Sequence, residues 1–239
     1  MLALCKEMGV KKLVYISSCS VYGVADYKKG YVVTEDSLLE RAPEARGTYS
    51  NAKFQAERVV LKAMKKHICP IVCLRPGTIF GPGGEIYTPM MGFSLGNRMF
   101  GVIGNGRFVL PLVYIDNLVD AIITAMEKKE SGGKIYNVVD PDNITKKEYI
   151  KSLIKKLYPR SKCFYIPYSL LYSSVFLQEI LSWILRRKPF LTRYRLTSSQ
   201  KNILYDSSKI QKELNWSPPF SFNDAVGDVI QYEKDRHKG

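Results

Sequence analysis

The sequence predicts an α/β protein whose core is a doubly wound parallel sheet, and three patterns support this fold class. Continuous apolar runs at residues 13–16 and 71–74 are typical of strands buried on both faces of a parallel sheet. Between these runs, apolar residues recur three and four positions apart from residue 49 to about 66, which indicates an amphipathic helix. The order strand, helix, strand is that of a sheet with helices packed on its faces.

The segments around this unit are less regular. Residues 1–12 have the pattern of the last turns of a helix that Gly9 ends, and such a helix without a start suggests that the chain begins midway through an element. Residues 24–47 are polar and form a loop long enough to serve function. Residues 81–107 form a connection rich in methionine and glycine, for which we expect some helical content.

Later segments resume the alternation of strands and helices. A strand-like run at 113–116 leads into a helix that Asp116 or Asn117 is placed to cap. Another strand is expected at 135–139, and a capping box at 145–148 opens a helix that extends to residue 157. An apparent helix from residue 223 closes the chain.

The charge of the chain is strongly positive. It has 36 Lys and Arg against 22 Asp and Glu, a formal charge of +14, which attracts phosphates, nucleotides, nucleic acid or anionic lipid. No basic low-complexity arm or nucleic-acid-binding motif accompanies this charge, and many lysines follow helix faces, as at 146–156. We therefore interpret most of it as solvated helix surface and expect no nucleic-acid partner.

The cysteines indicate a reducing compartment. There are five, an odd number, in mostly apolar surroundings, so we expect reduced core residues of a cytoplasmic protein. Cys69 and Cys73 are spaced too widely for a zinc knuckle, and His67 and His237 are the chain's only histidines, so we expect no metal site. The first nine residues carry charges where an export signal would have its apolar core.

Residues 166–185 are strongly apolar and are followed by three basic residues at 186–188. Their length approaches that of a membrane span, but polar residues recur every four positions from Ser174 to Ser182 and form a stripe on one helix face. We favour a helix packed in a C-terminal lobe. A helix lying on a membrane surface and a true span remain open alternatives, so the localisation is cytoplasmic with membrane association as an option.

A phenol and an ammonium stand four residues apart in the predicted helix that begins near residue 49. Tyr49 and Lys53 therefore share one helix face and can reach one ligand. A nearby cation favours the ionised form of a phenol, which suits such a pair to move a hydroxyl proton while hydride passes to or from a nicotinamide. Ser18 follows the preceding strand, at the sheet edge where α/β proteins bind ligands.

In this combination the sequence resembles the extended short-chain dehydrogenases/reductases, which include NAD-dependent epimerases and dehydratases and 3β-hydroxysteroid dehydrogenases. The matching stretches, in family order, are residues 9–23 (GVKKLVYISSCSVYG), Tyr49-x-x-x-Lys53, 74–83 (LRPGTIFGPG), 112–121 (LVYIDNLVDA) and the Asn215-Trp216 tail. The resemblance implies a partial Rossmann-type, doubly wound parallel sheet that lacks its first strands, plus a small C-terminal substrate lobe. Residues 1–80 would complete the nucleotide-binding domain, and 81–239 would form the lobe, with later Rossmann elements interleaved at about 108–140.

The resemblance also implies roles for individual residues. Tyr49 would be the catalytic acid/base, Lys53 would bind the nicotinamide ribose, and Ser18 would be the catalytic serine. Ser17 would take the place of Ser18 if the register is off by one. Four further residues would form a loop against the nicotinamide of NAD or NADP: Pro76, Gly77, Thr78 and Ile79.

The sequence departs from the family pattern at its start. A strand, a GxxGxxG turn and a helix that binds the pyrophosphate are expected there, and this sequence does not contain them. Its comparable glycines, Gly101, Gly104 and Gly106, occur late, have the wrong spacing and indicate a loop. We expect the strand at 13–16 to have a bare edge, so that the chain associates through it and binds NAD weakly.

The substrate class is the least constrained of these expectations. In nucleotide-sugar epimerases an Asn follows the strand that corresponds to the one ending at residues 75–77 of this sequence. Many sugar enzymes also have an arginine in the stretch that corresponds to residues 110–112. Both features are absent, which favours a 3β-hydroxysteroid dehydrogenase-like enzyme that interconverts a secondary alcohol and a carbonyl. The alternatives are a nucleotide-sugar epimerase or dehydratase and an inactive fragment unable to hold cofactor. The small-molecule substrate would thus be a lipophilic alcohol or a nucleotide sugar, and a homodimer is expected by family analogy.

Overall fold

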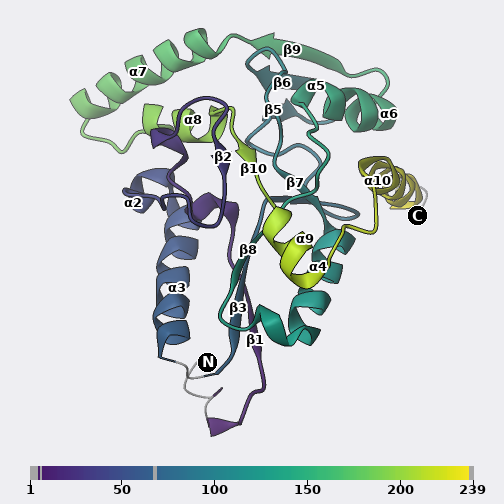
Figure 1. The fold of residues 1–239 in the computed structure, drawn as a ribbon. Coiled ribbons are helices and arrows are strands. Elements are labelled where there is room, and N and C mark those ends of the chain that lie inside the picture. The colour runs from purple at the N-terminus through teal and green to yellow at the C-terminus, as the bar shows by residue number, and fades with distance from the viewer. Residues whose placement is uncertain (1–4, 6, 67–68, 237–239) are drawn as a thin grey trace.

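The computed structural model describes residues 5, 7–66 and 69–236, and at their centre lies a parallel sheet of three strands. These are β1 (Leu13–Ile16), β3 (Ile71–Pro76) and β8 (Ile135–Val138), in the order β1-β3-β8. Leu13 pairs with Ile71, and Cys73 pairs with Ile135. Figure 1 shows the strands side by side, with helices on both sides.

The two faces of the sheet are covered by different helices, so the doubly wound α/β fold is confirmed. Helix α3 (Thr48–Lys65) covers one face, where its Val60 and Ala63 pack with Ile71. Helices α4 (Ile115–Glu127) and α9 (Ser208–Leu214) cover the other, against Val72 and Leu74. This alternation explains the continuous apolar run of β3, because each of its side chains meets a helix on one face or the other.

Strand β1 is the edge of this sheet in the described part of the chain. Its four residues are half-buried, whereas the sequence predicted burial on both faces. The reason is that β1 has a paired neighbour on one side, β3. Of the helix predicted in residues 1–12, Cys5 and Glu7 are helical and Gly9 has φ +61°, while residues 1–4 and 6 lie outside the described residues.

The predicted polar loop at 24–47 is more structured than its composition indicates. The connection from β1 to α3 contains the 3₁₀ turns η1 (Cys19–Val21) and η2 (Val24–Asp26), strand β2 (Val32–Val33) and helix α2 (Pro43–Arg46). Strand β2 pairs in parallel with β10 (Leu204–Tyr205), so this segment is joined to the C-terminal part of the chain.

The helical content predicted for 81–107 is wrong. After β4 (Thr78–Phe80), which pairs with β7 (Leu112–Tyr114), the chain forms an antiparallel hairpin of β5 (Gly92–Leu95) and β6 (Met99–Ile103). Close approach of the strands requires glycine at position 92, where a Cβ would lie 1.9 Å from the Gly101 carbonyl oxygen. A Cβ on Gly101 would lie 2.6 Å from the Phe93 ring, which would have to move to make room for it. These glycines obscure the strand pattern in the sequence.

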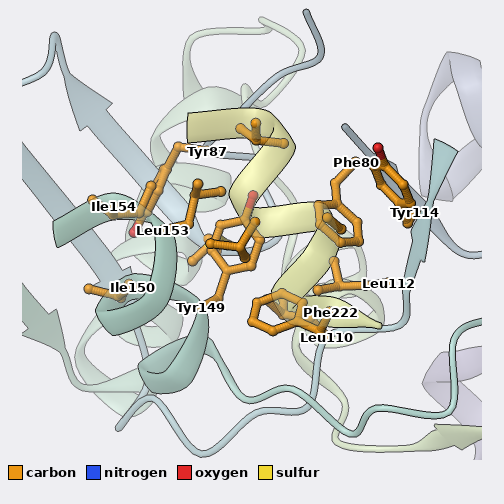
Figure 2. Close-up of a cluster of buried hydrophobic side chains, with 14 of the residues drawn as sticks. Phe80, Tyr87, Leu110, Leu112, Tyr114, Tyr149, Ile150, Leu153, Ile154 and Phe222 are labelled. Atoms are coloured by element: carbon orange, nitrogen blue, oxygen red, sulfur yellow. The ribbon is translucent and has the colours of Figure 1, made fainter. Parts of the chain in front are cut away.

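The C-terminal elements complete a second hydrophobic cluster (Figure 2), in which the Phe80 ring lies 5.9 Å from that of Phe222 and 6.3 Å from that of Tyr149. The predicted capping box is present at Thr145 and Glu148. The elements of this part are α5 (Lys146–Tyr149), a π-helical turn (Ile150–Ile154), α6 (Lys155–Leu157), β9 (Lys162–Ile166), α7 (Tyr168–Ile184), α8 (Arg193–Gln200) and α10 (Phe222–Arg236).

Two smaller expectations have different outcomes. Neither Asp116 nor Asn117 caps α4, because its N-cap is Tyr114. Asn117 is instead buried and donates hydrogen bonds to Asp140 Oδ1 at 3.0 Å and to the Phe220 carbonyl at 2.9 Å. The five cysteines are free thiols, as predicted.

Lys146 is a buried ammonium that links three elements of this part. Its Nζ donates to the Ile103 carbonyl at 3.0 Å and to Gln200 Oε1 at 2.6 Å, and lies 4.8 Å from the centre of the Phe108 ring. Burial lowers the pKa of Lys146 to about 7, because removal of water disfavours the charged form.

We predict that Lys146→Met changes how stability depends on pH. Between pH 7 and about 10 the unfolded chain binds more protons at Lys146 than the folded protein, so this residue makes stability rise with pH by up to ~1.4 kcal/mol per unit. Urea unfolding at pH 7 and 9 should show this rise in the wild type and a smaller one in Lys146→Met. Identical pH dependence in both proteins would contradict the prediction.

Candidate functional site

The predicted catalytic helix begins at the carboxyl end of the parallel sheet. Its N-cap, Gly47, has φ +107°, a conformation that favours glycine, and Tyr49 follows in the first turn with 62% of its surface exposed. One turn later, Lys53 Nζ donates a hydrogen bond of 3.0 Å to the carbonyl oxygen of Ile16, the last residue of β1. The structure thus places the amino group of Lys53 at the strand end that precedes the predicted serines.

The two serines after β1 have different partners. Ser17 is buried, and its hydroxyl donates to the Glu57 carboxylate. Ser18 Oγ accepts a hydrogen bond of 3.1 Å from the Ser20 backbone N–H and caps η1, which fixes the side chain at the sheet end. Ser18 therefore has its hydroxyl proton free to donate, whereas that of Ser17 is engaged.

The residues predicted to form a nicotinamide loop lie mainly in strands. Pro76 ends β3, Thr78 and Ile79 begin β4, and only Gly77 lies between the two strands. A Cβ on Gly77 would lie 2.2 Å from the Pro111 carbonyl oxygen, so this turn requires glycine. Pro76 is buried and Ile79 is exposed, so these four residues do not present one uniform surface.

A buried ion pair that the sequence analysis did not identify lies beneath this site. Glu57 of α3 and Arg75 of β3, each 1% exposed, form two hydrogen bonds: Arg75 Nη2 to Glu57 Oε1 at 2.7 Å and Nε to Oε2 at 3.2 Å. Arg75 Nη1 also donates to the Tyr22 hydroxyl at 2.8 Å and to the Glu35 carbonyl at 3.1 Å. The pair thus joins α3, β3 and the segment after β1.

Burial and partners act in opposite directions on these groups. Burial by itself would lower the pKa of Arg75. Hydrogen bonds and charge interactions with Glu57 and Tyr22 outweigh this effect and raise the pKa above its usual value, so the guanidinium stays charged. Burial raises the pKa of Tyr22 and of the Cys73 thiol, which therefore remain neutral. The fixed positive charge of Arg75 is matched by the Glu57 carboxylate.

A signal for this pair is present in the sequence. Glu57 follows Tyr49 and Lys53 at the same spacing of four, and one helix face therefore carries all three. Arg75 continues an apolar strand run, where a charge needs a buried partner. The position of Glu57 on this helix face and the charge of Arg75 within the strand together indicate an ion pair between the helix and the strand.

The site residues fit the nicotinamide end of NAD or NADP. Lys53 uses one of its three N–H donors on Ile16 and has others available for ribose hydroxyls. The exposed phenol of Tyr49 and the hydroxyl of Ser18 lie on elements that meet at the carboxyl end of a parallel sheet, where such ligands bind. Lys53, Tyr49, Ser18 and Gly77 would hold or face this part of the cofactor.

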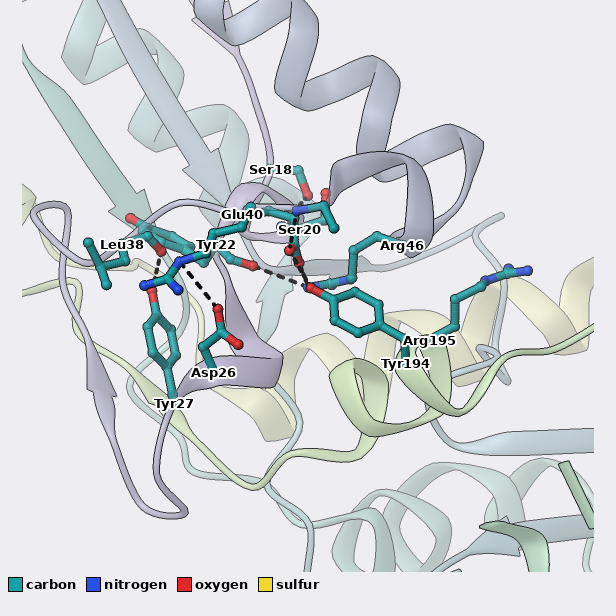
Figure 3. Close-up of polar contacts among 12 residues, drawn as sticks. Ser18, Ser20, Tyr22, Asp26, Tyr27, Leu38, Glu40, Arg46, Tyr194 and Arg195 are labelled. Atoms are coloured by element: carbon teal, nitrogen blue, oxygen red, sulfur yellow. Dashed lines mark hydrogen bonds and ion pairs between the residues drawn. The ribbon is translucent and has the colours of Figure 1, made fainter. Parts of the chain in front are cut away.

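Helix α8, which follows α7, is attached to the loop before α3 (Figure 3). The Tyr194 hydroxyl donates to the buried Glu40 carboxylate, and Arg46 Nη1 donates to the same carboxylate at 3.2 Å and to the Tyr22 carbonyl at 3.1 Å. Arg46 immediately precedes Gly47. Helix α8 therefore contacts the segment that leads directly into the first turn of α3.

Comparison with known proteins gives the chain a family. Residues 1–138 match the NAD dependent epimerase/dehydratase family. The chain is 30% identical over 240 residues to 3beta-hydroxysteroid-dehydrogenase/decarboxylase isoform 1 of Arabidopsis thaliana, covering 95% of this chain and 54% of that protein. It is 28% identical over 239 residues to the decarboxylating sterol-4-alpha-carboxylate 3-dehydrogenase of Mus musculus, with 95% and 64% covered.

Solved structures agree with this relationship. The NAD complex of UDP-glucuronic acid 4-epimerase from Bacillus cereus superposes with a TM-score of 0.69 at 21% identity, covering 99% of this chain and 65% of that one. The chain therefore belongs to the NAD dependent epimerase/dehydratase family and has its Rossmann-like α/β fold. It spans 54% and 64% of the length of the Arabidopsis and mouse relatives.

We predict that breaking the ion pair from one side destabilises the fold. Glu57→Leu leaves the Arg75 charge buried without its carboxylate and should lower the free energy of unfolding by ~3–5 kcal/mol. The double variant Glu57→Leu/Arg75→Met removes both charges and should recover most of this loss. Urea unfolding measures both, with the exposed Glu44→Leu as control; a double variant no more stable than Glu57→Leu would be the contrary result.

Proposed function

We propose that this chain carries the catalytic residues of an NAD(P)-dependent oxidoreductase that interconverts a secondary alcohol and a carbonyl on a 3β-hydroxysteroid-like substrate. The proposal depends on one observation: the N-terminal part of α3 lies at the end of β1. There the Lys53 amino group donates a hydrogen bond to the Ile16 carbonyl oxygen, next to the two serines. Similarity to two relatives named as sterol or steroid 3-dehydrogenases supports the substrate class.

The chain's own residues divide the work as follows. Tyr49 takes the proton from the substrate hydroxyl at its phenolic oxygen, and Ser18 Oγ donates a hydrogen bond to the same substrate oxygen. Lys53 binds the nicotinamide ribose through the N–H donors that its hydrogen bond to Ile16 leaves available. A bound nicotinamide would supply the hydride acceptor for the carbinol carbon. Residues Ser17, Pro76, Gly77, Thr78 and Ile79 complete the nicotinamide side of the site.

The division of the chain follows from these roles. Residues 1–80 contribute the catalytic part of the nucleotide-binding domain, and 81–239 contribute the substrate lobe, with β7 and β8 returning to the sheet region. A nucleotide-sugar epimerase or dehydratase is the second candidate, which the fold likeness to UDP-glucuronic acid 4-epimerase favours. An inactive fragment that keeps the fold without holding cofactor is the third.

Replacing Tyr49 by Phe should remove most turnover, because it deletes the proton-transferring oxygen and leaves the ring in place. We expect kcat for NAD-linked 3β-hydroxysteroid oxidation to fall by ~10²–10⁴-fold with little change in steroid binding. The exposed Tyr232→Phe serves as the control. Near-normal turnover in Tyr49→Phe would mean that the proton passes through another group.

We also propose that helix α7 and the basic residues after it contact an anionic membrane surface. No helix in the described part of the chain is both long and apolar enough to cross a bilayer. Only Val175 of α7 is buried, so the packed helix that the sequence favoured has most of its apolar side chains exposed. Trp183 is 80% exposed and Phe190 88%, on either side of the basic residues 186–188.

The arrangement of α7 suits a helix that lies in a membrane interface. Figure 1 shows α7 at the periphery of the molecule, away from the parallel sheet. Two of its polar residues contact the segment that follows: Gln178 Oε1 accepts from the Leu191 backbone at 3.1 Å, and Glu179 pairs with Arg193 at 2.6 Å. The apolar side chains are thus left to the outside, next to a cluster of positive charge.

Vesicle flotation tests this surface. The chain should float with vesicles that contain phosphatidylserine and much less with pure phosphatidylcholine, and Trp183→Glu/Phe190→Glu should reduce flotation by about tenfold or more, because the two rings lose their apolar contact. Leu38→Glu, at another exposed apolar residue, is the control. Equal flotation of all three proteins, or none with anionic vesicles, would contradict the proposal.

A homodimer through α3 is the oligomer that we propose. Ala52, Ala56 and Val59 are exposed on one side of this helix, at spacings of four and three. Small apolar side chains in this pattern allow a second helix to approach closely, which supports the family analogy. Sedimentation of the purified chain measures the association.

A further inference from the structure

We propose that Arg195 binds a carboxylate of the substrate beside the hydroxyl that Tyr49 deprotonates. The inference rests on the proposed alcohol-oxidising function and adds the residue that would recognise the carboxylate of a sterol 4-carboxylate, the substrate class that the name of the mouse relative states. The guanidinium lies against Gly47, the N-cap of α3, and no carboxylate of the described residues pairs with it.

The position of Arg195 is set by its neighbour on α8. The Tyr194 hydroxyl is fixed on Glu40, which is 3% exposed and also binds Arg46. Figure 3 shows the Tyr194 ring pointing to Glu40 while the Arg195 side chain extends away from it. The backbone from which Arg195 projects is therefore held by a buried contact, although the arginine itself is exposed.

The guanidinium of Arg195 lies beside the start of α3. A Cβ placed on Gly47 would be 3.4 Å from Cζ, from Nε and from Nη2 of Arg195, so the group lies broadside against this glycine. Gly47 is two residues before Tyr49, and the positive charge therefore stands within about one helical turn of the catalytic tyrosine.

Arg195 differs from the other arginines of this region in having its donors largely free. Arg193 pairs with Glu179 at 2.6 Å and Arg46 with Glu40 at 3.2 Å. The hydrogen bond of Arg195 Nη1 to the Phe190 carbonyl is long, at 3.4 Å. A guanidinium has five N–H donors in a planar fork that matches a carboxylate, so this one can still bind two oxygens of a ligand.

The chemistry of the proposed substrate accounts for a cation at this place. In a 3-hydroxy-4-carboxysteroid the carboxylate and the carbinol occupy neighbouring carbons, so a site that holds the hydroxyl at Tyr49 brings the carboxylate close to it. A bidentate contact to Arg195 would select this substrate over one without the acid, and orient the carbinol at the same time. The net charge of the chain attracts any anion without regard to its position, whereas a contact to Arg195 would fix the carboxylate beside the start of α3.

Equilibrium dialysis with the 239-residue chain tests the inference without requiring turnover. The two probes are a 3β-hydroxysteroid-4-carboxylic acid and its methyl ester, at 0.15 M salt, against the wild type, Arg195→Gln and Arg160→Gln. Arg160 is exposed in the turn between α6 and β9, and its replacement makes the same change in charge.

We expect the wild type and Arg160→Gln to bind the acid about tenfold more tightly than the ester, and Arg195→Gln to lose this preference through weaker binding of the acid alone. Equal binding of acid and ester by the wild type, or an unchanged preference in Arg195→Gln, would overturn the role of Arg195 and leave the hydroxysteroid proposal intact. Failure of both probes to bind the wild type would overturn the two together.

Discussion

The buried ion pair between Glu57 and Arg75 is the interaction on which the candidate site depends. It joins helix α3 to the central strand of the sheet, and the Glu57 carboxylate also accepts the Ser17 hydroxyl just after the end of β1. Lys53, one turn earlier on the same helix, is fixed on the Ile16 carbonyl. The strand end that carries Ser18 and the helix that carries Tyr49 are therefore positioned against each other by charged groups in a low-dielectric interior.

The C-terminal part of the chain contributes a second set of constraints on the same helix. Tyr194 and Arg46 converge on Glu40, and Arg46 directly precedes Gly47, the N-cap of α3. Helix α7 is attached to α8 through Glu179 and Arg193. The proposed membrane surface on α7 is therefore connected through α8 to the segment that leads into the first turn of α3. A lipophilic substrate that leaves the membrane at α7 would be close to elements that contact the proposed site.

Much of the fold could be predicted from the sequence because local patterns determine it. The apolar runs of β1 and β3 and the periodicity of α3 were sufficient for a parallel, doubly wound core. The spacing of Tyr49 and Lys53 predicted that one helix carries both, and both lie on α3, while their catalytic roles stay a prediction. The β5–β6 hairpin could not be predicted, since its Gly92 is required by a contact between strands. The roles of Glu57 and Arg75 also depend on a partner distant in sequence, and a local pattern does not identify such a partner.

The most direct test of the site is a titration of the isotope-labelled chain with nicotinamide mononucleotide, followed by amide chemical shifts in NMR spectra. This ligand contains the nicotinamide and ribose that Lys53 and Tyr49 are proposed to hold, without the adenosine half of the cofactor. We predict shift changes that concentrate at Ser18, at the first turns of α3 and at Gly77 and Thr78. Changes confined to other parts of the chain, with these amides unaffected, would contradict the assignment of the site.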